Sequence, residues 1–145
     1  MTTDETRTIA RRFFGAWRWE FEVVDELAHP AITVAYPLMP RVVVGADAYK
    51  RALQKIHADF PDFAFVGEEP IADGDRAVVV WRGGGTHTGT LLGVPATGKI
   101  VRFSGISVYR VRDGKVVEER GEEDTMSILQ QVGALGRTAE APAEN

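Results

Sequence analysis

Two long strand-forming segments joined by a tight turn constrain the fold of this chain most. The residues from about Val101 to Val111 and from Lys115 to Glu123 alternate as strands do, and Asp113-Gly114 stands between them. An Asp-Gly pair tolerates two positive φ angles, so this spacing predicts a long antiparallel hairpin. The hairpin runs directly into a short amphipathic helix predicted from Thr125 to Val132. A curved hairpin that ends in a helix can form one wall of a pocket.

The N-terminal half predicts helices. Thr2 and Glu5 have the spacing of a capping box, which places the start of a first helix there. Its large apolar residues recur every fourth position and must be buried on one face; they are Ile9, Phe13, Trp17 and Phe21. Shorter segments predict a second helix at 23–28, a strand at 31–36, a third helix at 45–58 and a strand that begins at 63.

A run of three glycines, Gly83-Gly84-Gly85, interrupts the long strand predicted from Arg76 to Thr88. Consecutive glycines in a strand indicate a bulge, a sharp bend or a close approach of the backbone to another group, and we expect a bend. The element order is helices first, then an antiparallel meander closed by a helix. This order predicts an α+β fold in which helices cover one face of a sheet.

Composition excludes several classes of function. The chain has 145 residues, which predicts one domain over 1–136, followed by a polar, Ala/Pro-rich tail at 137–145 that we expect to be disordered. A formal net charge of −4 with intermixed charges argues against nucleic-acid or membrane partners. There is no cysteine, which excludes disulfides, thiolate catalysis and cysteine-bound metals. With no secretion signal or membrane span apparent, we expect a cytoplasmic protein.

Motifs for metals and nucleotides are also missing. The histidines lack ligand spacing with a carboxylate, and no HExxH-like segment or nucleophile elbow occurs. The glycine-rich segments lack the strand, turn and helix context of a phosphate-binding loop. We therefore expect neither a metal nor a cofactor.

Alternation along the hairpin sorts its side chains into two faces. Aromatic content favours one face as the inner one, and its residues are Val101, Phe103, Gly105, Ser107 and Tyr109 on one strand, with Val117, Glu119, Gly121 and Glu123 on the other. Ile106 and Val108 on the opposite face suggest that this side is partly buried too, as in a homodimer.

The sequence resembles the SnoaL-like polyketide cyclase family, also described as ester cyclases, within the nuclear transport factor 2-like superfamily. The resemblance covers about residues 5–133. It rests on RRFFGAW at 11–17, FPDF at 60–63, GTHTG at 85–89, LLGVPATG at 91–98, FSGISVYRVRDGKVVEE at 103–119 and DTMSILQQVG at 124–133. It implies a cone-shaped α+β barrel, in which a strongly bent antiparallel sheet wraps around the N-terminal helices and leaves a cavity.

In the characterised cyclases that the chain resembles, an aspartate on the last strand acts as the acid/base group of an intramolecular aldol ring closure. A histidine on the preceding strand assists it. Anchoring the comparison on Asp113-Gly114-Lys115 places Gly121 and Ser107 at those positions, and neither moves a proton near neutral pH. Glu123, on the same face, and Asp124 are the replacements that we predict as catalytic acid/base groups. The structural alternatives are a solvated acidic strand and, for Asp124, a helix cap.

Other candidate residues concern binding. His87 lies in a GxHxG setting shared with the resembled cyclases and is predicted to polarise or orient a carbonyl, although a lone histidine is often structural. The predicted substrate-binding residues are aromatic or polar residues that either line a flat apolar pocket or fill the core; they are Trp17, Tyr36, Trp81, Ser107 and Tyr109.

Two functions follow as expectations. The first is a cofactor-independent enzyme that performs cyclase, lyase or isomerase chemistry on a small hydrophobic carbonyl-bearing molecule. The second is a non-catalytic module that binds a small hydrophobic ligand or forms dimers, because Gly121 and Ser107 stand at the family's acid/base positions.

Overall fold

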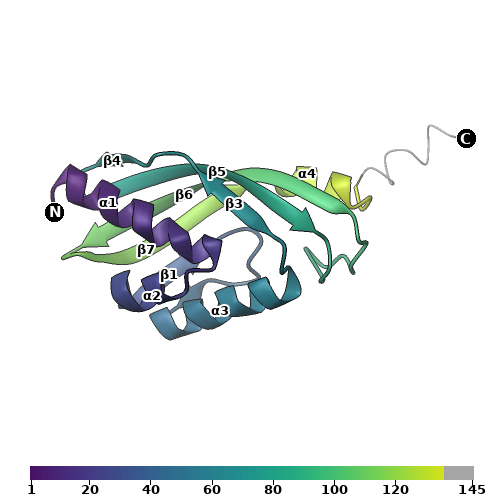
Figure 1. The fold of residues 1–145 in the computed structure, drawn as a ribbon, viewed down its shortest axis with the longest axis horizontal. Coiled ribbons are helices and arrows are strands. Elements are labelled where there is room, and N and C mark those ends of the chain that lie inside the picture. The colour runs from purple at the N-terminus through teal and green to yellow at the C-terminus, as the bar shows by residue number, and fades with distance from the viewer. Residues whose placement is uncertain (136–145) are drawn as a thin grey trace, which may run out of the picture.

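A curved seven-stranded sheet covers three N-terminal helices, with a fourth helix beyond the end of the hairpin (Figure 1). The structure is a computed structural model, and it describes residues 1–135. The helices are α1 (Thr3–Phe13), a 3-10 turn η1 (Phe14–Arg18), α2 (Glu22–Leu27), α3 (Ala46–Asp59) and α4 (Thr125–Gln131). The strands are β1 (Ala28–Ala35), β2 (Val43–Val44), β3 (Ala64–Gly67), β4 (Ile71–Asp73), β5 (Arg76–Thr86), β6 (Ile100–Arg112) and β7 (Lys115–Glu123).

The order of the strands in the sheet is β2-β1-β7-β6-β5-β3, and β4 also pairs with β5. The predicted α+β fold with a bent sheet over N-terminal helices is therefore confirmed. One pair departs from a purely antiparallel sheet, because β1 runs parallel to β7. Parallel neighbours need a long crossover, and all the elements from β2 to β6 lie between these two strands in the chain.

The predicted hairpin forms at Asp113-Gly114, where both residues have positive φ angles, 50° and 80°. The predicted inner face is also confirmed along most of its length, because Phe103, Ser107 and Tyr109 are buried. Near the turn the assignment was wrong, since Val116 is buried in place of Val117. The register of β6 and β7 shifts between Arg110 and Val111, and such a shift reverses the alternation of side chains.

The glycine run in β5 is a site of close backbone approach. The pairing of β5 with β6 continues without a shift from Arg76 to Thr86, so the glycines form no bulge. A Cβ atom on Gly83 would lie 2.6 Å from the Ala64 carbonyl oxygen and would overlap the Phe65 ring. The absence of side chains therefore lets β3 pack Phe65 directly over β5.

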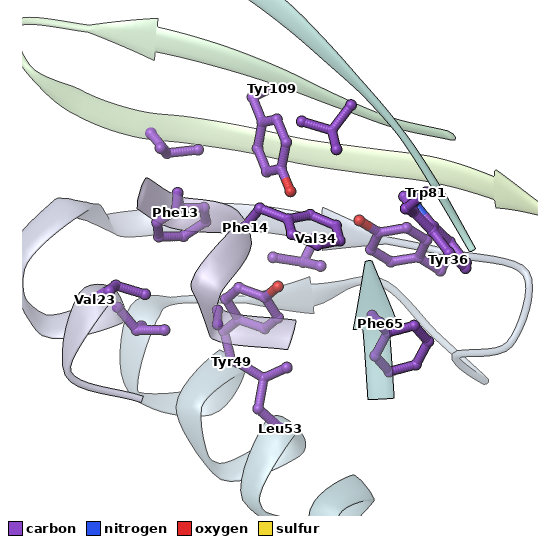
Figure 2. Packing of buried hydrophobic residues seen from close by; sticks show 14 of the residues in the cluster. Phe13, Phe14, Val23, Val34, Tyr36, Tyr49, Leu53, Phe65, Trp81 and Tyr109 are labelled. Atoms are coloured by element: carbon purple, nitrogen blue, oxygen red, sulfur yellow. The ribbon is translucent and has the colours of Figure 1, made fainter. Parts of the chain in front are cut away.

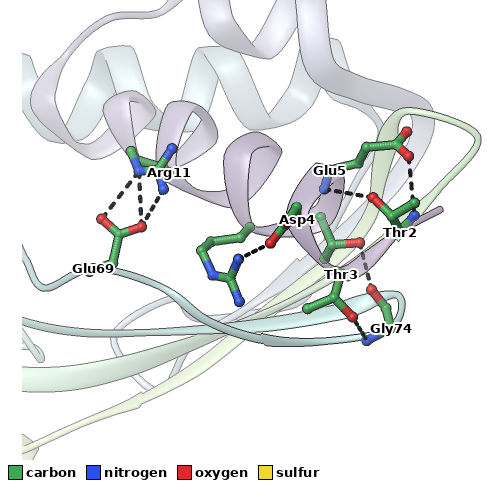
Figure 3. Close-up of polar contacts among 9 residues, drawn as sticks. Thr2, Thr3, Asp4, Glu5, Arg11, Glu69 and Gly74 are labelled. Atoms are coloured by element: carbon green, nitrogen blue, oxygen red, sulfur yellow. Dashed lines mark hydrogen bonds and ion pairs between the residues drawn. The ribbon is translucent and has the colours of Figure 1, made fainter.

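Helix α1 is fixed at its start by the predicted capping box (Figure 3). The Thr2 hydroxyl accepts a hydrogen bond from the Glu5 amide at 3.1 Å, and the Glu5 carboxylate accepts one from the Thr2 amide at 3.3 Å. The Gly74 amide donates to the Thr3 hydroxyl at 3.0 Å, which ties α1 to the turn after β4. Arg11 forms an exposed ion pair with Glu69 on the segment before β4.

The core lies between the N-terminal helices and the concave side of the sheet, where aromatic rings meet from many elements (Figure 2). Phe13 packs edge-on against Tyr109 with 5.9 Å between ring centroids. Of the predicted apolar stripe, Phe13 is fully buried, and the partly buried Ile9, Trp17 and Phe21 pack against the core cluster. None of the helices within residues 1–135 has the length and apolar character that crossing a membrane requires.

Candidate functional site

An apolar cavity of about 430 Å³ lies between η1, α3 and the inner face of the sheet. This volume falls within the range of small-molecule sites. Most of its wall is apolar and aromatic, including Trp17, Tyr36, Phe60, Phe65, Trp81 and Phe103. Ser107 and Glu123 add polar groups from the hairpin, and the segments 38–41 and 90–92 complete the wall. The cavity therefore suits a largely hydrophobic molecule held by a few polar contacts.

Two carboxylates line this cavity, Asp59 at the end of α3 and Glu123 at the end of β7. The pKa of Glu123 is raised to about 7, chiefly by burial and also by the nearby Glu122 carboxylate, against the opposing effect of a hydrogen bond from the Leu38 backbone amide. That amide donates to Glu123 Oε1 at 2.5 Å. A carboxyl group with this pKa exchanges protons near neutral pH, as a general acid or base must.

Another carboxylate of β7, Glu119, is buried four residues before Glu123. It accepts hydrogen bonds from Trp17 Nε1 at 2.8 Å, from the Tyr49 hydroxyl at 2.8 Å and from the Tyr36 hydroxyl. Burial raises the pKa of Glu119, and these three hydrogen bonds partly offset the shift. No ion pair within residues 1–135 includes Glu119.

Tyr36 links Glu119 to the cavity wall. Its hydroxyl oxygen lies 2.6 Å from Ser107 Oγ, and Trp81 Nε1 donates to the same Ser107 oxygen at 3.0 Å. Figure 2 shows Tyr36 and Trp81 side by side at this end of the core. The polar atoms from Trp81 to Glu119 therefore form a continuous chain beneath an apolar surface.

Gly121 and Ser107 pair directly across the hairpin, in the register that the sequence comparison requires. A Cβ atom on Gly121 would overlap the Tyr36 ring, 2.7 Å from its Cδ1 atom, and would lie 2.6 Å from the Ile106 carbonyl oxygen. Tyr36 therefore fills the space in front of Gly121, and a larger residue at position 121 requires the tyrosine to move.

Five of the eight predicted site residues line the cavity, namely Trp17, Tyr36, Trp81, Ser107 and Glu123. Tyr109 is buried in the core against Phe13, and its hydroxyl has no hydrogen-bond partner among residues 1–135. Asp124 caps α4, where its carboxylate accepts a hydrogen bond from the Ser127 amide at 3.0 Å. Asp124 and Tyr109 are not among the residues that line the cavity.

His87 is fully buried and also lies outside the cavity lining. Its Nδ1 atom accepts a hydrogen bond from the Thr97 amide at 3.2 Å and lies 2.8 Å from Thr97 Oγ1, while Nε2 lies 3.1 Å from the Val94 carbonyl oxygen. These partners require the tautomer in which Nε2 carries the proton. His87 thereby anchors the loop at 88–98 through Val94 in its middle and Thr97 near its end, and Leu91 and Leu92 of this loop line the cavity.

Glu119 is the residue that the sequence prediction missed. Alternation predicts Glu119 on the inner face of β7 but assigns it no role. Glu119 and Glu123 lie four residues apart on that face, and a carboxylate directed into an aromatic core must find hydrogen-bond donors. That combination was the available signal.

No group of three or more metal-binding side chains among residues 1–135 is arranged to hold a metal ion.

Comparison with known proteins places these features in a family. The SnoaL-like polyketide cyclase family profile matches residues 7–132. A nogalonic acid methyl ester cyclase from Streptomyces nogalater is 31% identical over 115 residues, which is 76% of this chain and 83% of that protein.

Solved structures share the fold. TsrD from Streptomyces laurentii superposes with a TM-score of 0.79 at 23% identity, over 93% of this chain and 99% of that one. An NTF2-like protein from Burkholderia xenovorans LB400 superposes with a TM-score of 0.71 at 21% identity, over 91% and 98% of the two chains. The predicted resemblance is confirmed, and the chain belongs to the SnoaL-like polyketide cyclase family with a nuclear transport factor 2-like fold.

Proposed function

We propose that this protein is an enzyme that uses Glu123 as an acid/base group on a small hydrophobic carbonyl-bearing molecule, in an aldol-type ring closure or a related lyase or isomerase step. The observation that carries the proposal is a carboxyl group with a pKa of about 7 in the wall of an apolar cavity. Membership of the cyclase family and the likeness to a nogalonic acid methyl ester cyclase support the substrate class.

The chemistry needs one base and one hydrogen-bond donor. The Glu123 carboxylate removes a proton from the carbon beside a carbonyl group, so that the C–H bond breaks and an enolate forms. The enolate carbon then attacks a second carbonyl group of the same molecule, which forms a C–C bond and leaves an alkoxide. The alkoxide takes the proton back from Glu123, and the carboxylate is restored without a cofactor.

The cavity supplies the other requirements of this reaction. Its aromatic walls bind a planar apolar molecule, and the Ser107 hydroxyl provides a hydrogen-bonding group on the inner face of the hairpin. A hydrogen-bond donor placed at the carbonyl oxygen stabilises the negative charge that develops there. Asp124 caps a helix and His87 anchors a loop, so neither residue has a part in the proposed proton transfer.

The alternative is a protein that binds such a molecule without converting it. The observation in its favour is that Tyr36 fills the space in front of Gly121, so that the family's acid/base position is closed. The predicted homodimer and cytoplasmic location stay predictions under either function.

Deuterium exchange separates the two functions. Nogalonic acid methyl ester and the simpler diketone naphthoylacetone are incubated with the protein in deuterium oxide, and mass spectrometry follows ring closure and deuterium uptake. We expect the wild-type protein to accelerate exchange, with a rate that rises as Glu123 ionises around its pKa of about 7. Glu123→Gln should reduce the enzymatic rate at least about 100-fold, a typical contribution of one acid/base group.

Glu122→Gln is the matched control, because Glu122 is exposed and its charge raises the pKa of Glu123. This variant should keep the maximal rate and shift the pH midpoint downward. Acceleration that survives in Glu123→Gln would disprove the role of Glu123. Thermal stabilisation by both compounds with no acceleration of exchange would instead favour the binding function.

A further inference from the structure

Glu119 is a buried carboxylate to which the proposed proton transfer assigns no role. Its partners are two aromatic hydroxyls and one indole N–H, and none of them carries a positive charge. Burying a carboxylate away from cations is costly, and it is uncommon for a group that serves packing alone. An apolar residue here would avoid that cost, which points to a functional reason for the carboxylate.

The titratable groups that surround Glu119 are tyrosines from three elements. Tyr36 follows β1, Tyr49 lies on α3 and Tyr109 lies on β6, and burial raises the pKa of each one well above its ordinary value. The positive charge of Arg18 lowers the pKa of Tyr109 and so partly opposes the effect of burial. The three tyrosines therefore stay neutral near pH 7, and Glu119 is the group of this cluster that titrates.

The ionisation state of Glu119 sets the direction of the hydrogen bonds along the chain of hydroxyls. When Glu119 is ionised, Tyr36 donates its proton to the carboxylate and accepts one from Ser107, so the single Ser107 proton is used inside the protein. When Glu119 is protonated, its proton can go to Tyr36 Oη, and Tyr36 then donates to Ser107. Ser107 already accepts from Trp81, so its own proton is released toward the cavity.

The alternative position for the added proton is disfavoured by Tyr49. If Glu119 Oε1 carried the proton, the Tyr49 hydroxyl would have to accept it and would lose its acceptor. Within residues 1–135 the other hydrogen-bonding group at the Tyr49 hydroxyl is the Trp17 indole N–H, which donates and cannot accept the Tyr49 proton. A buried donor without a partner is destabilising, because its hydrogen bond to water has been lost without replacement. Protonation on the Tyr36 side leaves every hydroxyl of the chain satisfied.

We propose that Glu119, Tyr36 and Ser107 form a proton relay whose protonated state presents the Ser107 hydroxyl as the donor to a ligand carbonyl in the cavity. The proposal rests on the proposed function, since it assumes a carbonyl-bearing ligand. In full transfer, Glu123 takes the carbon-bound proton while Ser107 gives its proton to the carbonyl oxygen. Ser107 then takes the proton of Tyr36, Tyr36 takes that of Glu119, and the products are an enol, protonated Glu123 and ionised Glu119. The reverse transfers restore every group.

The relay predicts opposite ionisation of two carboxyl groups during catalysis. Glu123 must be ionised to accept a proton, whereas Glu119 must be protonated to make Ser107 a donor. Binding of a carbonyl ligand should therefore favour proton uptake by Glu119. Ser107 is the residue that touches the ligand, and Tyr36 and Glu119 act through it.

The test uses the fluorescent naphthyl ketone Prodan, whose emission moves to longer wavelength when its carbonyl oxygen accepts a hydrogen bond. All variants are made in the full chain on a Glu123→Gln background, which removes the titration of Glu123 from the cavity. In this background we expect bound Prodan to emit at longer wavelength at low pH and to shift to shorter wavelength as pH rises and Glu119 ionises.

Three variants give distinct expectations. Ser107→Ala removes the donor and should give short-wavelength emission at every pH. Tyr36→Phe removes the acceptor that competes for the Ser107 proton, and should give long-wavelength emission at every pH. Glu119→Gln cannot titrate, so the emission should lose its pH dependence. Tyr109→Phe is the control for the nearest hydroxyl outside the chain: the Tyr109 hydroxyl interacts with Ser107, and the pH-dependent shift should persist without it.

The outcomes also separate the relay from the proposed function. A pH-dependent shift that persists in Glu119→Gln, or long-wavelength emission in Ser107→Ala, would overturn the relay while the exchange experiment on Glu123 stands. Wild-type protein that does not bind Prodan would overturn the assignment of the cavity to carbonyl ligands, and the relay with it. Infrared spectra provide a second readout: a protonated carboxyl band should grow when Prodan binds, and Glu119→Gln should lack it.

Discussion

Tyr36 occupies the space that a side chain on residue 121 would need. Gly121 lies opposite Ser107 across the hairpin, and a Cβ atom on it would overlap the Tyr36 ring. In place of an aspartate and a histidine at these two positions, the tyrosine hydroxyl bonds both Ser107 and Glu119. The glycine at position 121 and the inward position of Tyr36 are therefore parts of one arrangement.

The first prediction concerns restoring an aspartate at this position. Gly121→Asp should lower the free energy of unfolding by about 1–3 kcal/mol, because overpacking forces the Tyr36 ring to shift. Tyr36→Ala should be destabilising alone, through the loss of a buried ring. The double variant should be less destabilised than the sum of the two, and chemical denaturation of all four proteins measures this coupling. Additive effects would show that the two side chains do not compete for the same space.

The second prediction concerns stability and pH at Glu123. Its pKa of about 7 in the folded protein lies above the ordinary value of 4.5, so the folded state binds the proton more tightly than the unfolded chain. The stability contributed by this group is present below pH 4.5 and is lost as pH rises toward 7. The loss should be on the order of 1 kcal/mol, after discounting for the partial exposure of the carboxyl group.

Comparison with Glu123→Gln isolates this contribution, because the amide does not titrate. Urea unfolding of both proteins is measured between pH 4 and pH 8. Any stability advantage of the wild-type protein over the variant should shrink as pH rises, or reverse in favour of the variant. A difference that stays constant over this range would contradict the raised pKa.

The third prediction concerns His87 and the loop at 88–98. His87→Ala removes the hydrogen bonds to Thr97 and Val94, so the loop that carries Leu91 and Leu92 loses its anchor. Prodan binding should weaken several-fold, and proteolysis within the loop should become faster. The pH midpoint of the deuterium exchange rate should not move, because His87 positions the loop and does not transfer the proton.

His29→Ala is the matched control, since this exposed histidine bonds only the nearby Ala31 amide among residues 1–135. It should bind Prodan as the wild-type protein does. A lost or shifted pH midpoint in His87→Ala would restore the predicted catalytic role of His87.

The fourth prediction concerns Asp124. Asp124→Ala should cost about 1 kcal/mol of stability, because the Ser127 amide loses its capping acceptor. Asp124→Asn keeps an acceptor and should cost only a few tenths of that. Thermal unfolding measures both variants, and the exchange rate should be unchanged in the asparagine variant. An exchange rate that falls with Asp124→Asn at unchanged stability would place Asp124 in the proton transfer.

Local rules predicted the parts of this protein that local interactions determine. The hairpin at Asp113-Gly114 follows from the backbone freedom of these two residues. The capping box follows from the three-residue spacing of Thr2 and Glu5. Alternation along β7 placed Glu119 and Glu123 on the inner face because successive side chains in a strand point in opposite directions. The predicted disordered tail lies outside the described residues.

Tertiary structure alone decided which groups those inner-face residues contact. Glu123 lines the cavity and Glu119 reaches Trp17, Tyr36 and Tyr49, because chain segments about 70 to 100 residues apart in sequence converge there. The sequence likewise gave no indication that Tyr36 fills the space at Gly121, or that Val116 replaces Val117 in the core after a shift in register. Such contacts depend on the three-dimensional packing of distant elements, whereas strand alternation and turn geometry depend only on neighbouring residues.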